Sequence, residues 1–250
     1  MEERVQNTIS EEDWFRNKVY WLSFLFSLLV VWAHSLNGEL FVTGEQELET
    51  VQQLEHLAAS QLAQIAVPGF FMISAYLFYR NFQLNSLFSK WRSRSRTILL
   101  PYLLWNSLYY GAYAAATRIP AICQIIGKPP VPLTAGEFLK ALLHYGYNPV
   151  FWYLFQLILL ILLAPVLYVL LKKNVRGLLF LLFLILCLWK GVSFPWLNLD
   201  ALFYYSAAAF FALRREQLGN YLERRPAESL KERWKHLFIQ ITILSFFFWL

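Results

Sequence analysis

VYWLSFLFSLLVVWAHSLNG, residues 19–38, is the stretch that decides the class of this protein. It lies between Lys18 and Glu39 and contains 20 residues without a single Asp, Glu, Lys or Arg. A helix of about 20 apolar residues is long enough to cross the roughly 30 Å hydrocarbon core of a bilayer. We therefore predict that this stretch forms a transmembrane helix.

The composition of the whole chain indicates the same class. Of the 250 residues 58% are hydrophobic and 15% are charged, and the mean hydropathy is +0.43. Soluble domains typically contain about 25% charged residues. We predict an all-α, polytopic transmembrane bundle that forms a single domain over residues 1–250. The net charge of +6 does not indicate nucleic-acid binding, because the basic residues are grouped between the apolar blocks.

Further charge-free blocks follow along the chain. Three are long enough for a crossing and contain 24, 21 and 31 residues, at 56–79, 97–117 and 141–171. Two blocks of 13 residues, 177–189 and 201–213, are short, and they could form either two crossings or a re-entrant hairpin. Another apolar block begins at His236. The pattern predicts about six to seven spans.

Basic residues predict the orientation of these spans. Eighteen of the 22 Lys and Arg residues lie in four segments, at 1–18, 80–96, 172–176 and 214–235. Because basic residues favour the cytoplasmic side, we expect the N-terminal tail (1–16) and the loop 214–236 to be cytoplasmic. Loops 37–56 and 118–148 then face outward. The regular alternation favours two crossings over a hairpin for the two short blocks.

His34 lies near the outer end of the first predicted span. Sixteen residues separate it from Lys18, which corresponds to about 24 Å along a helix. Tyr20, Ser23 and Ser27 lie on nearly the same helix face. These residues could serve helix packing, with His34 bonded to a neighbouring helix. An ionisable group inside a membrane is equally a candidate for function.

Four phrases in the chain carry a family resemblance. They are VVWAHS (30–35), PGFFMISAYLF (68–78), SKWRSRSRTILLPYLLW (89–105) and NPVFWYLFQLILLILLAPVLY (148–168). In this order, over residues 15–170, they resemble the acyltransferase-3 family of membrane proteins, which O-acylate cell-surface polysaccharides and related glycans. The chain departs from the family pattern at Ser23, where an arginine is usual, and at Ala75, where glycine is usual. The family typically has about ten spans, so the resemblance implies that this chain is a truncated form of that fold.

The resemblance implies an O-acetyltransferase. Such enzymes move an acyl group, here expected to be acetyl, from cytoplasmic acyl-coenzyme A to a hydroxyl of a cell-surface or lipid-linked glycan. Acetyl-coenzyme A is then a co-substrate, and no bound cofactor or metal is expected. His34 is the expected general base, since a positioned imidazole can take the hydroxyl proton. Glu39 is a candidate to orient the imidazole, or simply one of five acidic residues in its loop.

The expected binding residues lie at both ends of the spans. Arg92, Arg94 and Arg96 are candidates for the phosphates of coenzyme A, because guanidinium groups bind phosphate in a bidentate manner; the alternative is a topology signal alone. Ser23 occupies the position of the family arginine in the donor-binding set. Substrate-binding candidates are Asn148, Trp152 and Tyr153, although the two aromatic residues could instead be interfacial anchors.

Two other functions are compatible with a polytopic chain that is basic on the inside. One is a transporter or flippase-like protein of a glycan pathway, although no internal repeat supports it. The other is a non-catalytic relative of the acyltransferases, which Ser23 keeps possible. In each case we expect a multi-pass protein of the bacterial plasma membrane, in contact with its lipids.

Overall fold

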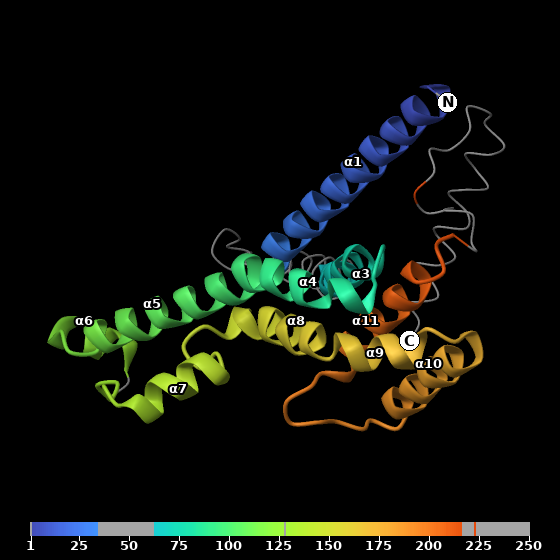
Figure 1. Cartoon of the computed structure of the whole chain (residues 1–250). Coiled ribbons are helices and arrows are strands. Elements are labelled where there is room, and N and C mark those ends of the chain that lie inside the picture. The colour runs from blue at the N-terminus through green and yellow to red at the C-terminus, as the bar shows by residue number, and fades with distance from the viewer. Residues whose placement is uncertain (1, 35–62, 128, 217–222, 224–250) are drawn as a thin grey trace, which may run out of the picture. The chain divides into compact units, whose positions relative to one another are not determined.

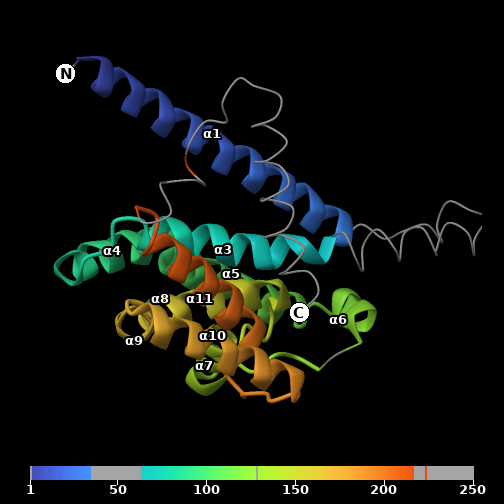
Figure 2. The same ribbon diagram turned by 90° about the vertical axis from the view of Figure 1, so that its right-hand side faces the viewer.

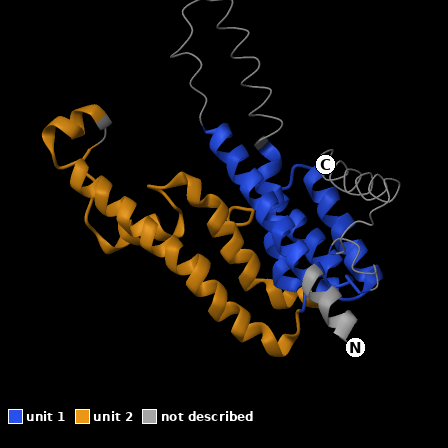
Figure 3. Ribbon diagram, turned by 90° about the horizontal axis from the view of Figure 1, so that it is seen from above, with its two compact units in different colours: residues 1–81, 170–193, 199–250 blue, residues 82–169, 194–198 orange. Residues whose placement is uncertain are grey.

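The structure is a computed structural model that describes residues 2–34, 63–127, 129–216 and 223. Every regular element in these residues is a helix, and no β-strand occurs among them, which confirms the predicted all-α class. The chain divides into two compact units (Figure 3). Unit 1 contains residues 1–81, 170–193 and 199–250, and unit 2 contains residues 82–169 and 194–198.

Unit 1 is built around helix α11. Its described helices are α1 (Glu2–Ala33), the short 3-10 helix η3 (Ala63–Ile65), α3 (Ala66–Tyr79), α10 (Asn174–Trp189) and α11 (Leu199–Ala212). Most residues of α11 are buried. Helix α3 lies beside α11 (Figure 2), and α10 packs against α11 as well. This arrangement places the apolar block 201–213 in the core of the unit.

Two glycines allow close packing of aromatic rings in unit 1. A Cβ atom at Gly69 of α3 would lie 2.2 Å from the ring of Phe26 on α1, and one at Gly177 of α10 would lie 2.5 Å from Phe210 on α11. Such distances are far below van der Waals contact, so any larger residue would displace the ring. Phe26 is therefore one of the residues through which α1 packs against α3, together with Phe15, whose ring lies 5.8 Å from that of Tyr76.

Unit 2 begins with a nearly continuous helical stretch. Its elements are η4 (Leu84–Ser86), α4 (Leu87–Arg94), the π-helical turn η5 (Ser95–Leu99), α5 (Leu100–Ala116), α6 (Pro120–Ile126), α7 (Ala135–Leu143), η6 (Pro149–Phe151), α8 (Trp152–Leu162) and α9 (Ala164–Leu171). Helices α4 and α5 are joined by η5 without a loop (Figure 1). Helix α9 ends in unit 1, at residues 170 and 171.

The predicted spans correspond to helices of varied length. Among the described residues no helix is, taken alone, both long and apolar enough to cross a membrane. The stretches Pro149–Leu162 and Ala164–Leu171 satisfy the criterion together and bend by 62° where they meet. The predicted outer loop 118–148 contains α6 and α7. The number and orientation of the spans stay predictions; loop 37–56 and the apolar block after His236 lie outside the described residues.

Candidate functional site

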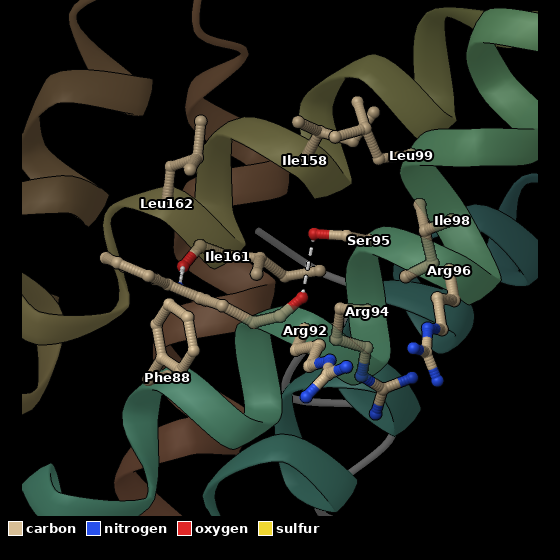
Figure 4. A pocket seen from close by; sticks show the side chains of 11 residues that line it. Phe88, Arg92, Arg94, Ser95, Arg96, Ile98, Leu99, Ile158, Ile161 and Leu162 are labelled. Carbon is tan, nitrogen blue, oxygen red and sulfur yellow. Dashed lines mark hydrogen bonds between the residues drawn. The ribbon is translucent and has the colours of Figure 1, made fainter.

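The three predicted phosphate-binding arginines line a single pocket in unit 2. The pocket has a volume of about 580 Å³ and is formed by α4, η5 and α8, with Phe88, Trp91, Arg92, Arg94, Ser95, Arg96, Ile98, Leu99, Ile158, Ile161 and Leu162 as its lining. Figure 4 shows the guanidinium groups on one side and the side chains of Leu99, Ile158 and Leu162 on the other. The pocket therefore combines a cationic rim with an apolar wall.

Local sequence explains why the helix changes form at this pocket. Pro101 lacks the N–H that would bond the carbonyl of Thr97, so the regular α-helical ladder is interrupted just before it. The chain forms the π-helical turn η5 there, with the N–H of Leu100 bonded to the carbonyl of Ser95. The hydroxyls of Ser95 and Thr97 donate to the carbonyls one turn earlier, at 2.9 and 3.2 Å. Single π-helical turns of this kind are frequent at functional sites.

A second proline shapes the apolar wall. Pro165 cannot donate to the carbonyl of Ile161, four residues earlier, and the helix breaks between α8 and α9. The indole N–H of Trp91 donates to this carbonyl at 2.9 Å instead. A side chain of α4 thus bonds a carbonyl at the break after α8, in addition to the N–H of Leu163. This bond holds the two sides of the pocket together.

The cationic rim has no acidic partner among the described residues. No carboxylate there lies within ion-pair distance of Arg92, Arg94 or Arg96. Burial, and next the charge of Arg94, lower the pKa of the nearby Lys90 amine. Additional positive charge is therefore unfavourable at the rim, and an anionic ligand would relieve the repulsion.

The predicted substrate-binding residues lie in unit 2 as well. Trp152 and Tyr153 form the first turn of α8, the helix that also supplies the apolar wall. Tyr153 lies five residues before the wall residue Ile158 on this helix. Asn148 is buried just before η6. Trp152 and Tyr153 thus share a helix with the apolar wall of the pocket, and Asn148 precedes that helix.

The predicted catalytic residue belongs to unit 1. His34 follows the last residue of α1 and is exposed, and its backbone N–H bonds the carbonyls of Val30 and Val31 at 3.2 Å. The carbonyl of Ser23 accepts a hydrogen bond of 2.8 Å from the Ser27 hydroxyl. The described structure therefore leaves the imidazole accessible, and it does not pack against another described helix. Glu39 lies outside the described residues.

Sequence comparison adds the identity of the family. A family described as an acyltransferase domain matches residues 19–250. This chain belongs to the acyltransferase-3 family. Membership confirms the predicted resemblance and gives the general class, a membrane acyltransferase. No curated protein and no solved structure matches the chain.

Several residues of this acyltransferase-3 protein were not found by sequence reasoning. Trp91 was predicted only as part of the basic phrase 89–105, and the wall residues Ile158, Ile161 and Leu162 only as parts of an apolar block. Pro165 was the available signal, since a proline within a long helix leaves a carbonyl that needs another donor. In the part of the chain that the structure describes, no group of His, Cys, Asp and Glu is arranged to hold a metal ion.

A charge cluster in unit 1 was also missed. Arg80, which ends α3, donates to both carboxylate oxygens of Glu223 at 2.8 and 2.9 Å, and it also pairs with Glu12 of α1. Glu223 further accepts from the Tyr76 hydroxyl at 2.8 Å and pairs with Arg215 at 3.2 Å. The cluster ties α1, α3 and the segment after α11 together at one end of unit 1.

Proposed function

We propose that this acyltransferase moves an acetyl group from cytoplasmic acetyl-coenzyme A to a hydroxyl of a cell-surface or lipid-linked glycan. The observation that carries the proposal is the pocket of unit 2, where three arginines face an apolar wall in a chain of the acyltransferase-3 family. A donor for this pocket needs a strongly anionic end and a less polar arm. Coenzyme A thioesters have both.

The donor is bound by the two sides of the pocket. Arg92, Arg94 and Arg96 bind the phosphates, because a planar guanidinium forms paired, charge-assisted hydrogen bonds with phosphate oxygens. The pantetheine arm lies along the wall formed by Ile158 and Leu162. A volume of about 580 Å³ lies within the range of small-molecule sites.

The transfer step uses His34 as general base. Its imidazole accepts the proton of the glycan hydroxyl while the oxygen attacks the thioester carbonyl carbon. The carbon–sulfur bond then breaks, the ester forms on the glycan, and coenzyme A leaves as its thiolate. Glu39 orients the imidazole, and Ser23 faces the donor in place of the usual arginine.

Membrane embedding is supported by the side chains that the described helices leave exposed. On α10 large apolar residues are about half exposed, namely Leu178, Leu179, Leu182, Phe183 and Leu186. On α5 the same holds for Leu104, Trp105 and Leu108. Apolar surfaces this extensive are normally covered by lipid or by a partner. We place the protein in the plasma membrane of a bacterium as a multi-pass protein, with the arginines on the cytoplasmic side, as the distribution of basic residues predicts.

An activity assay on the purified chain in lipid nanodiscs tests this proposal. We expect release of coenzyme A from acetyl-coenzyme A and transfer of a labelled acetyl group to glycan in a membrane extract. A transporter would produce neither. Absence of both release and transfer, with saturable acetyl-coenzyme A binding retained, would instead identify a non-catalytic relative, which is the second candidate because Ser23 replaces the family arginine.

A further inference from the structure

Two buried amide side chains of unit 2 carry polar atoms that have no hydrogen-bond partner among the described residues. Asn106 of α5 is 1% exposed; its Nδ2 donates to the carbonyl of Tyr102 at 2.9 Å, whereas its Oδ1 has no partner. Asn148 is 4% exposed, and its Nδ2 has no partner. Buried polar groups are nearly always paired, so two unpaired groups in one unit require an explanation.

The two amides lie on segments of unit 2 that pack against each other. Two aromatic contacts join α5 to the segment that carries Asn148, namely Tyr102 with Phe151 (ring centroids 6.0 Å apart) and Tyr110 with Tyr147 (5.5 Å). Asn106 lies one helical turn from each of these α5 tyrosines, on the same face. Asn148 lies between the two partner rings along the chain. The free acceptor and the free donor thus belong to the two segments that these ring contacts join.

We propose that Asn106 and Asn148 together bind one hydroxyl group of the acceptor glycan. A hydroxyl donates one hydrogen bond and accepts others, so it can donate to Asn106 Oδ1 and accept from Asn148 Nδ2. The proposal rests on the proposed function, in which a glycan hydroxyl is the acceptor. It makes Asn106 a substrate-positioning residue, and it gives Asn148 a defined role.

The segment around Asn148 lies close to the surface. Gly146, Pro149 and Val150 are exposed, and they flank the buried asparagine on both sides in the chain. Tyr145 has a φ of 43°, a left-handed conformation that is unusual for a tyrosine, and its ring contacts Phe155 at 5.6 Å. Strained backbone of this kind is concentrated at ligand sites. Asn148 is therefore a buried residue within an otherwise exposed segment.

Water has the same hydrogen-bonding chemistry as a sugar hydroxyl, so the experiment must separate the two. The probe is labelled methyl β-D-glucopyranoside, and its equilibrium binding to the full chain in nanodiscs is measured. The test variant N106L/N148L removes both free polar atoms and keeps the same number of side-chain heavy atoms. The control is Gln156→Leu, because Gln156 is a buried amide of the same unit whose two ends are bonded to Trp196 and Asn198 at 3.1 and 2.9 Å.

We expect saturable binding by the parent protein. The dissociation constant of N106L/N148L should be at least about tenfold higher, since two hydrogen bonds to the ligand are lost. The unfolding temperature of this variant should fall less than that of Gln156→Leu, because Asn106 loses only its Nδ2 bond to the Tyr102 carbonyl and the other two polar atoms have no partner to lose. Gln156→Leu should show the reverse, with a lower unfolding temperature and binding within about twofold of the parent.

Deoxy glycosides identify the source of the hydroxyl. The deoxy analogue that lacks the bound hydroxyl should bind the parent as weakly as the intact glycoside binds N106L/N148L. Removing that hydroxyl should not weaken binding to N106L/N148L any further. If the ratio of the parent's affinity to the variant's affinity is the same for every deoxy analogue, the amides hold water and the proposal is wrong. Unchanged binding by the variant, or no saturable binding by the parent, also overturns it. Failure of the proposed function would differ, with no coenzyme A released while the glycoside still binds.

Discussion

The indole N–H of Trp91 donates a hydrogen bond of 2.9 Å to the carbonyl oxygen of Ile161. Ile161 lies four residues before Pro165, which has no N–H to bond this oxygen. The bond joins α4 to α8, and both residues line the arginine pocket. The break that Pro165 causes in the helix is thus compensated by a side chain of the proposed donor site.

Trp91→Phe should lower the unfolding temperature and raise the KM for acetyl-coenzyme A. The substitution keeps an aromatic ring but removes the indole donor from the Ile161 carbonyl, which then accepts only from the Leu163 N–H, at a cost of about 1 kcal/mol. In a Pro165→Ala background the new backbone N–H can bond this carbonyl, so the same substitution should cost less. Thermal unfolding of the parent, Trp91→Phe, Pro165→Ala and the double variant measures the difference. The control is Trp105→Phe, because this tryptophan of α5 is 51% exposed. Equal losses in both backgrounds would show that the bond does not compensate the proline.

Glu223→Gln should destabilise unit 1 much more than Glu12→Gln. The Glu223 side chain is 9% exposed and bonds Arg80, Arg215 and Tyr76, so the substitution removes the carboxylate that these two partly buried arginines share, at a cost of up to about 3–5 kcal/mol. The Glu12 side chain is 54% exposed, and exposed ion pairs contribute at most about 1 kcal/mol. Unfolding temperatures of the two variants in detergent decide the matter; equal effects would contradict the ranking.

The contribution of Glu12 should depend on pH in a defined direction. Hydrogen bonding from Arg80 holds the pKa of Glu12 below its ordinary value of about 4.3. A carboxylate with a lowered pKa stabilises the folded state above its unfolded pKa, and this contribution is lost as the pH falls through the folded pKa. The difference in unfolding temperature between the parent and Glu12→Gln should therefore be constant from pH 7 to 5 and shrink below about pH 4. A difference that grows on acidification would exclude the ion pair as its source.

Cysteine labelling should establish the orientation of the chain. With Cys123 and Cys187 replaced by serine, single cysteines placed at positions 40–50 should react with an impermeant thiol reagent in intact cells. A cysteine beside Lys172 should react only after the cells are opened, because basic segments favour the cytoplasm. The opposite pattern would move the arginine pocket to the outer side and remove its access to cytoplasmic coenzyme A.

His34→Gln should reduce acetyl transfer by about 10²-fold or more at pH 7, because an amide cannot take up the hydroxyl proton. His34→Ala should lose as much, and both variants should insert at normal levels, since the described structure leaves His34 exposed. His144→Gln is the matched control, because His144 is also exposed and its ring contacts Trp196 at 4.7 Å. A well-inserted His34→Gln protein that transfers at the parent rate would exclude His34 as the base.

The sequence was sufficient to predict the helical class and the family, because long charge-free blocks have few structural solutions and the four phrases occur in order. It also identified all three arginines of the pocket, since Arg-rich cytoplasmic segments suit phosphate binding. The apolar wall could not be predicted from spacing. Ile158 and Leu162 resemble any other residues of an apolar helix, and their role depends on how α8 packs against α4.

Buried polar groups were the least predictable part of the site. Asn106 lies within an apolar block where an asparagine usually serves helix packing, and only the contacts of its two ends show that one of them is free. The partners of Arg80 are equally invisible in the sequence, because Glu12 and Glu223 lie 68 and 143 residues away. Such long-range pairs depend on tertiary packing, which charge patterning along the chain does not reveal.

The most direct test of the account is equilibrium binding of acetyl-coenzyme A to the purified full chain in nanodiscs. We predict saturable binding by the parent, weakened at least about tenfold in R92Q/R94Q/R96Q, since charge-assisted hydrogen bonds to the phosphates are lost. K172Q/K173Q, which removes charges from another basic segment outside the pocket, should bind like the parent. Equal affinity of the parent and the triple arginine variant, with both normally inserted, would contradict the assignment of this pocket to the donor.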